Sequence, residues 1–206
     1  MLISHAHILS PTFQASLTLS LLLLTQCGLE LVSDLLLVDG LLRIVKDVTV
    51  RLHAKDRPVF VSDVTIPDLE PTLKWLEEQG GTELASRLRS AMGEGKLLID
   101  APEFYTGCLP FWEMPEGLKQ SYSAASVVIT KGDANYRRLL GDLHWPYDTS
   151  FNELMDYWPT SIAALRTCKS GVLVGVAPEV SAAAAAAAPD KWLVAGLYGC
   201  VQARIA

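Results

Sequence analysis

The chain has 206 residues, of which half are hydrophobic and five are tryptophan, and this suits one α/β domain with a sizeable core. The net charge of −6 and the isoelectric point near 5.2 argue against general nucleic-acid binding, which needs a basic face. No block of lysine and arginine offers a membrane patch, so we expect neither nucleic acid nor a membrane as a partner.

The first expected element is the strongly apolar run at residues 17–24, which we interpret as a buried parallel strand. A signal peptide is disfavoured because the first basic residue is Arg43, which leaves no basic region ahead of the run. The run is also well short of the ~20 residues that a membrane span needs. Residues 1–16 carry no clear pattern and stay unassigned.

Strand-like apolar runs then alternate with helical patterns. The periodicity predicts helices over Leu29–Ile44 and Asp68–Gln79, and a short helix near Asn135–Leu140. The expected strands are Leu19–Leu24, Val48–His53, Val59–Ser62, Lys96–Ile99, Val127–Thr130, Ala163–Leu165 and Val172–Val176. This alternation indicates an α/β fold with a mainly parallel sheet covered by helices on both faces.

Two stretches look irregular. Residues 102–117 are rich in proline, glycine and aromatic residues, and we expect a long loop that packs against the domain. The low-complexity segment Ser181–Asp190 reads as a surface insertion in preference to a short helix that ends before Pro189.

The cysteines and histidines show no metal-ligand spacing. The four cysteines, Cys27, Cys108, Cys168 and Cys200, are scattered without a CxxC pair, which fits reduced thiols of a cytoplasmic protein and small core residues. His53 and His144 are interpreted as structural.

Polar residues gather after several of the predicted strands. The carboxyl ends of parallel strands meet at one edge of a sheet, where ligands of open α/β folds bind. We therefore expect one site from Thr25, Gln26, Gly28, Glu30, Ser62, Asp63, Thr65, Thr130, Lys131, Gly132, Asp133, Asn135, Arg137, Arg166, Thr167 and Lys169.

The chemistry of these residue types points to a metal and a phosphate. Asp63 and Asp133 offer hard oxygen ligands for a magnesium- or manganese-like ion. Lys131, Arg137, Arg166 and Lys169 are cations that can hold a phosphate. A metal and cations around a phosphate are what phosphoryl transfer to water requires.

Simpler interpretations stay open at this point. Asp63 or Asp133 alone is most often a helix N-cap, and a single lysine or arginine is most often a solvated surface charge. Asp34 and Asp39, on the expected helix Leu29–Ile44, read as part of a solvated face.

Several motifs in order resemble the damage-control phosphatase family, in particular the subfamily with an Arg-Thr-x-Lys (RTxK) motif. They are "GLELVSDLLLVDGLL", "RPVFVSDVT", "KGDANYRRLLGD" with a tryptophan after it, "RTCK" and "KWLVAGLYGCVQ". The resemblance covers residues 19 to 206 and makes 17–206 a damage-control phosphatase-like domain. The subfamily has also been described as protein-glutamate O-methyltransferases.

The resemblance implies a three-layer α/β/α sandwich preceded by a helical N-terminal region, which in this interpretation is absent here. It implies hydrolysis of small phosphorylated sugars, such as fructose 1-phosphate, with manganese, cobalt or nickel; magnesium is a further candidate.

The resemblance also implies roles for individual residues. Asp63 would be a metal ligand, and Asp63 and Asp133 would be catalytic. The substrate would contact Asp133, Ala134, Asn135, Tyr136, Arg137 and Lys169; the RTxK motif is Arg166, Thr167, Cys168 and Lys169. Glu30 falls where a methyl-donor site for S-adenosylmethionine has been assigned.

The chain departs from the family at Thr25 and Gln26, where an Asp-Asn metal-binding pair is expected. These residues offer only neutral oxygens, so we expect weaker binding of a hard divalent cation and impaired activity. The sequence thus predicts a metal-dependent sugar-phosphate phosphatase. The alternatives are a non-catalytic protein that binds a phosphorylated metabolite, or a protein-carboxyl methyltransferase.

Overall fold

Six strands form one sheet in the computed structural model, which describes residues 18–23, 27–60 and 62–206. Five are parallel and the sixth is antiparallel to β5; the order across the sheet is β3-β2-β1-β4-β5-β6. The strands are β1 (Thr18–Leu23), β2 (Thr49–His53), β3 (Leu97–Asp100), β4 (Val127–Lys131), β5 (Ser161–Thr167) and β6 (Gly199–Arg204).

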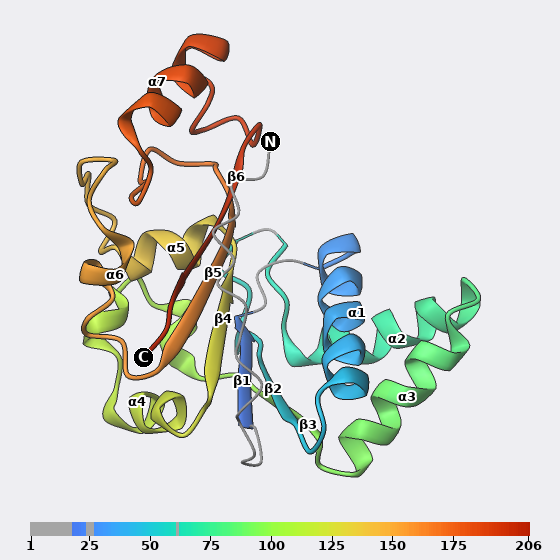
Figure 1. The fold of residues 1–206 in the computed structure, drawn as a ribbon. Coiled ribbons are helices and arrows are strands. Elements are labelled where there is room, and N and C mark those ends of the chain that lie inside the picture. Colours follow the sequence, from blue (N-terminus) through green and yellow to red (C-terminus); the bar gives the residue numbers. More distant parts are fainter. Residues whose placement is uncertain (1–17, 24–26, 61) are drawn as a thin grey trace.

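Helices flank this sheet on both sides, as expected for an α/β fold. They are α1 (Leu29–Ile44), α2 (Leu69–Glu78), α3 (Thr82–Gly93), α4 (Glu116–Ser123), α5 (Asp133–Leu139), α6 (Phe151–Leu154) and α7 (Pro178–Ala187). Figure 1 shows α1, α2 and α3 on one side of the sheet and α4, α5 and α6 on the other. Three short 3₁₀ turns, Ile66–Asp68, Glu103–Thr106 and Phe111–Glu113, join them.

The order of strands reverses beside β1. From β1 the chain proceeds outward to β2 and β3, and then returns to lay β4 against the opposite edge of β1. The register pairs Leu21 of β1 with Leu52 of β2 and with Ile129 of β4. In open α/β sheets the helices after such neighbouring strands leave on opposite faces and open a crevice at the carboxyl ends.

Two separate hydrophobic clusters pack against the two faces of the sheet. One joins α1, α2 and α3 to the β2 side through fully buried residues such as Leu31, Leu52 and Leu88. The other packs aromatic residues, including Phe111 and Tyr122, under β4 and β5. Burial of each such side chain contributes about 1.5–3 kcal/mol.

Two of the predicted strands, Val59–Ser62 and Val172–Val176, are wrong. Residues 59, 60 and 62 form bends and a turn, and residue 61 lies outside the described part of the chain. Residues 172–176 form an extended loop in which Val172 and Val174 are buried. This apolar run enters the core without a strand partner because β6 occupies the edge of β5.

Two further expectations need correction. The low-complexity segment belongs to a helix, α7, which begins at Pro178; alanine has the highest helix propensity and proline is favoured in the first turn. Cys108 is exposed and is therefore not a core residue, although all four cysteines are free thiols. Sequence reasoning also missed α3, α4, α6 and β6.

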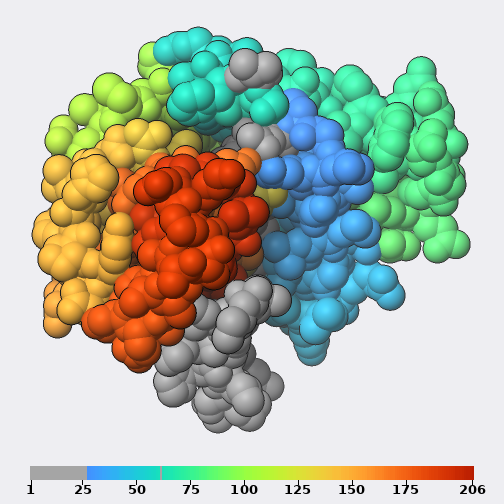
Figure 2. Space-filling model, turned by 90° about the horizontal axis from the view of Figure 1, so that it is seen from above, coloured from blue at the N-terminus to red at the C-terminus, as the bar shows by residue number. Residues whose placement is uncertain are grey.

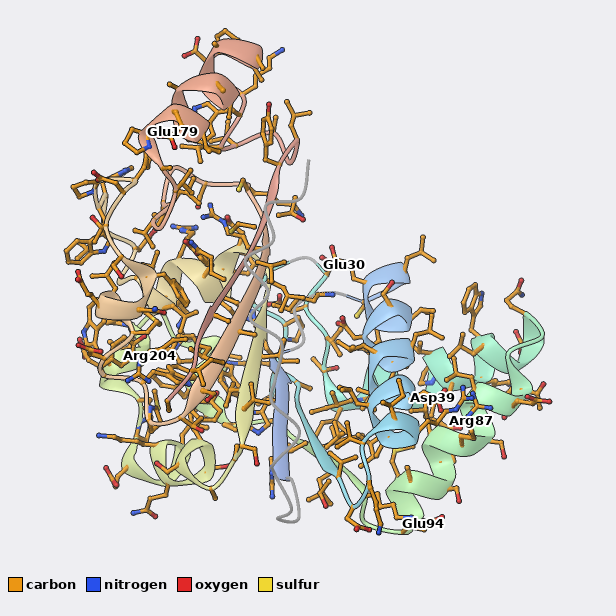
Figure 3. All side chains as sticks on the ribbon, in the orientation of Figure 1. Glu30, Asp39, Arg87, Glu94, Glu179 and Arg204 are labelled. Carbon is orange, nitrogen blue, oxygen red and sulfur yellow. The ribbon has the colours of Figure 1, made fainter. Side chains whose placement is uncertain are left out.

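Asp39 is buried against α3 and is not part of a solvated face. Its carboxylate accepts two hydrogen bonds from Arg87, at 2.7 and 2.8 Å, and the two side chains meet between α1 and α3 in Figure 3. The hydrogen bond to Arg87 lowers the pKa of Asp39.

No helix among the described residues is both long enough and apolar enough to cross a membrane. The cytoplasmic location stays a prediction.

The buried histidine of β2 has a structural role, as expected. His53 hydrogen-bonds to the hydroxyl of Tyr105 and stacks on Tyr122. Burial lowers the pKa of His53 from 6.5 to about 4. Between pH 6.5 and 4, His53 is therefore protonated in the unfolded chain but mostly neutral in the folded chain. The free energy of unfolding falls as the pH is lowered through this range.

We predict that His53→Gln flattens this part of the stability profile. The wild-type free energy of unfolding should fall by roughly 2–3 kcal/mol more than that of the variant between pH 6.5 and 4. Urea titrations across this range measure it. Parallel slopes for His53→Gln and wild type would contradict the assignment.

Candidate functional site

A cavity of about 860 Å³ opens at the carboxyl edge of the sheet. It is built by the start of α1, the loop after β2, the β4–α5 junction, the end of β5 and the start of β6. Figure 2 views the molecule from this edge, where α1 in blue lies beside the C-terminal segment in red. The lining includes Glu30, Lys55, Asp63, Lys131, Asp133, Ala134, Asn135, Arg137, Arg166, Thr167, Lys169 and Cys200.

Asp63 organises the loop that follows β2. Its Oδ2 accepts a hydrogen bond from Lys55 Nζ at 2.6 Å and from the backbone N–H groups of Val59 and Phe60 at 2.9 and 2.7 Å. The Asp63 carboxylate and the Lys55 ammonium are both buried. The second oxygen, Oδ1, has no hydrogen-bond partner among the described residues.

Arg166, the arginine of the RTxK motif, is a buried structural residue. Its fully buried guanidinium donates to Asp133 Oδ1 at 2.7 Å, to the Ser170 carbonyl at 2.8 Å and to the Val172 carbonyl. It also lies over the ring of Tyr136, 4.4 Å from the centroid. These contacts fix the turn after β5 against the start of α5.

Asp133 accepts further hydrogen bonds from the turn after β5. Besides Arg166, its Oδ1 accepts the Lys169 backbone N–H at 3.2 Å and the Ser170 hydroxyl at 3.1 Å. Gly132, just before it, has φ of 93°, which favours glycine, and its N–H donates to the Leu165 carbonyl at 2.8 Å. Asp133 Oδ2 has no partner in the described part of the chain.

Lys131 crosses the crevice to α1. Its ammonium lies 2.8 and 2.9 Å from the two oxygens of Asp34 and 3.4 Å from Glu30, which Figure 3 labels at the start of α1. Asp34 is thus buried and paired, so its assignment to a solvated face was wrong. Burial raises the pKa of Asp34, although Lys131 acts in the opposite direction.

The remaining two cations of the cavity, Arg137 and Lys169, differ in whether they form an ion pair within the described chain. Arg137 makes a two-pronged pair with Asp142, with N–O distances of 2.7 and 2.6 Å; the hydrogen bond raises the pKa of Arg137 and lowers that of Asp142. Lys169 is exposed and, within the described chain, is the one cation of the lining without an ion pair. It is therefore the charge most available to an incoming anion.

The other predicted site residues divide between lining and support. Ala134, Asn135 and Thr167 line the cavity, and the Asn135 amide donates to the Lys131 carbonyl at 2.8 Å. Tyr136 and Cys168 lie buried behind it. Thr25 and Gln26 lie outside the described residues.

The described residues do not by themselves fit a divalent metal ion. No group of three histidine, cysteine, aspartate or glutamate side chains in the described part of the chain comes together as a metal site. One oxygen of Asp63 already accepts a hydrogen bond from Lys55, and one oxygen of Asp133 accepts a hydrogen bond from Arg166. Glu30, the expected methyl-donor position, contacts Lys131.

Sequence reasoning missed four residues that shape the site: Lys55, Asp34, Asp142 and Ser170. Lys55 and Asp142 lie within eight residues of their partners, Asp63 and Arg137. The opposite charges close together in the sequence could therefore have predicted these two pairs. Asp34 is 97 residues from Lys131, and no local signal could have joined the two.

Five basic and three acidic side chains line this cavity, although the chain as a whole carries a net charge of −6. Such an excess of positive charge at the switch point of an α/β sheet raises the local concentration of small anions.

Comparison with known proteins gives the family. Residues 20–183 match the damage-control phosphatase ARMT1-like domain. Over 88% of its length the chain is 34% identical to damage-control phosphatase ARMT1 of Rattus norvegicus, and over 92% it is 32% identical to that of Homo sapiens. The chain therefore belongs to the damage-control phosphatase family, as the motifs indicated.

The chain spans less than half the length of these relatives, 43% and 44%. Among solved structures, a DUF89 family protein from Pyrococcus horikoshii aligns with a TM-score of 0.41 and 18% identity, over 74% of this chain and 41% of that one.

The buried arginine yields a stability prediction. Arg166→Lys keeps the charge but loses the planar fork that contacts Asp133, Ser170 and Val172 together, so we expect a loss of roughly 2–4 kcal/mol in the free energy of unfolding. Chemical denaturation measures it. Arg137→Lys is the matched control, because its pair with Asp142 is exposed, and should cost less than about 1 kcal/mol. Equal losses for both variants would refute the structural role of Arg166.

Proposed function

We propose that this chain binds small phosphorylated sugars in the cavity and acts on them as a phosphomonoester hydrolase of the damage-control class. The observation that carries the proposal is the Lys169 ammonium, which has no ion pair among the described residues and lines a cavity with an excess of basic groups. A phosphate dianion adds to these charges without displacing an existing ion pair. Family membership supports phosphatase chemistry.

Each basic residue supports binding in a different way. Lys169 offers a mobile ammonium on an exposed side chain, whereas Arg137 presents a guanidinium already oriented by Asp142. Arg166 belongs to the cavity wall, but its buried guanidinium is engaged by protein partners, and it acts by holding the turn that carries Lys169. Asp63 and Asp133, the proposed catalytic carboxylates, each keep one oxygen without a partner among the described residues.

The metal dependence is a separate part of the proposal. A manganese, cobalt, nickel or magnesium ion would supply charge neutralisation at the phosphate, and Asp63 is the described residue proposed to contact it. Because Thr25 and Gln26 bring no charge to such an ion, we expect weak metal binding and low turnover.

A non-catalytic binding protein is the second candidate, and it is favoured by the lack of a three-ligand metal cluster among the described residues. The cations of the cavity would still recognise a phosphorylated metabolite in such a protein. We see no feature in the described chain that favours the methyltransferase alternative or S-adenosylmethionine.

Lys169→Gln tests the binding part. Loss of one charge-assisted contact should weaken the affinity for fructose 1-phosphate about tenfold, which corresponds to roughly 1.4 kcal/mol, as measured by isothermal calorimetry. Lys119→Gln removes an exposed lysine on α4, outside the cavity lining, and serves as the control with unchanged affinity. If both variants bind like the wild type, Lys169 does not recognise the phosphate.

Thr25→Asp combined with Gln26→Asn tests the catalytic part. The double variant restores the expected charge at the metal position, so phosphate release from fructose 1-phosphate with Mn²⁺ should rise by at least about tenfold over the wild type. The control variant is Thr25→Asn with Gln26→Asn, which adds amide oxygens but no charge. A double variant that remains as slow as this control would reject the explanation by lost charge.

A further inference from the structure

Two cysteines far apart in the sequence lie near each other at the wall of the cavity. Cys168 is the third residue of the RTxK motif and is buried, and Cys200 lies on β6, is half-buried and lines the cavity. The register of the β5–β6 pair, in which Arg166 lies opposite Cys200, makes these two cysteines neighbours across the two strands. Cys27 and Cys108, the other two cysteines, are not part of this contact.

The strand register explains the contact. Arg166 lies opposite Cys200 in the antiparallel β5–β6 pair, and the Cys168 N–H donates to the Tyr198 carbonyl at 2.8 Å. Side chains two residues apart point to the same face of a sheet, so Cys168 lies on the face of Arg166 and Cys200. The two cysteines are thus diagonal neighbours on the face packed against α5.

The surroundings favour reaction at Cys168. The neighbouring Cys200 thiol and the guanidinium of Arg166 lower the pKa of Cys168, whereas the Cys168 thiol and burial raise the pKa of Cys200. A thiolate next to a protonated thiol is the arrangement in which one cysteine attacks an oxidant and the other resolves the product. Cys200 lines the cavity, so this is the side from which we expect a small oxidant to approach the pair.

We propose that Cys168 and Cys200 form an oxidative modification site, at which a peroxide closes a disulfide between the RTxK turn and β6. Their contact across the β5–β6 pair and their position at the cavity wall carry this inference.

The reaction balances with peroxide as the two-electron oxidant. The Cys168 sulfur attacks one peroxide oxygen, the O–O bond breaks, and a first water leaves with the Cys168 proton. The Cys200 sulfur then attacks the resulting sulfenic acid, the S–O bond breaks, and a second water leaves with the Cys200 proton. Each cysteine loses one electron, and two waters are released for each disulfide.

Closure of this bond should move the RTxK turn. Diagonal neighbours in an antiparallel pair have Cα atoms about 7–8 Å apart, whereas disulfides usually need 4.4–6.8 Å. Cys168 follows the last residue of β5, so it can approach β6 more easily than Cys200 can leave the strand. That movement draws the Lys169 N–H away from Asp133 Oδ1, now 3.2 Å distant, and shifts the Lys169 ammonium.

The disulfide itself is tested without reference to phosphate. Wild-type protein is treated with hydrogen peroxide and digested with trypsin without reduction. The expected product is a reducible link between the peptides 167–169 and 192–204, with intact protein lighter by two hydrogen atoms. Cys27→Ser with Cys108→Ser is the matched control and should form the same link. Oxygen additions at Cys168 or Cys200 without this link would overturn the proposal.

The effect on binding rests on the proposed function. Oxidised protein should bind fructose 1-phosphate about tenfold more weakly than reduced protein, and dithiothreitol should restore the affinity. The Cys200→Ser variant should keep its affinity after the same treatment. Unchanged affinity in linked wild-type protein would refute the coupling to Lys169. Absence of binding in the reduced protein would refute the proposed function and leave the disulfide result standing.

Discussion

The buried ion pair between Arg166 and Asp133 is the constraint on which the rest of the site depends. A guanidinium without solvent exposure is costly unless all its donors are satisfied. Here Nε meets a carboxylate, the two terminal nitrogens meet backbone carbonyls of the turn after β5, and the Tyr136 ring covers one face. Because these partners come from α5 and from the turn after β5, the pair specifies how β5, its following turn and α5 fit together.

This arrangement separates the residue that holds the turn from the residue that meets the ligand. Two positions of one short motif, Arg166 and Lys169, carry the same charge but have opposite environments. The buried arginine cannot exchange its partners without unfolding the turn. The exposed lysine has no ion-pair partner in the described chain and so loses nothing when an anion arrives. In the proposed function, Lys169 would therefore supply most of the affinity for a phosphate, and the other cations would neutralise the carboxylates with which they are paired.

The alternation of apolar runs was enough to predict the α/β fold, and the rule that ligands bind at the carboxyl ends of strands was enough to bring Asp63, Asp133 and Lys169 to one cavity. Local patterns failed where a distant partner decides the outcome. Val172 and Val174 look like a strand but pack as a loop because β6 pairs with β5, and the burial of Asp34 depends on Lys131, 97 residues away.

The residues proposed to bind phosphate and those proposed to bind a metal follow different strands of this sheet. Lys169 and Arg137 follow β5 and β4, whereas Asp63 follows β2 and the Thr25-Gln26 pair follows β1. The two faces of the sheet have separate hydrophobic clusters, and the buried residues of β5 belong to the cluster on the face of α4, α5 and α6. A loss of charge beside β1 would remove none of the contacts that hold Arg166 and Asp133. In the proposed function, phosphate binding would then persist while metal-dependent turnover falls, and so binding and turnover need to be measured separately.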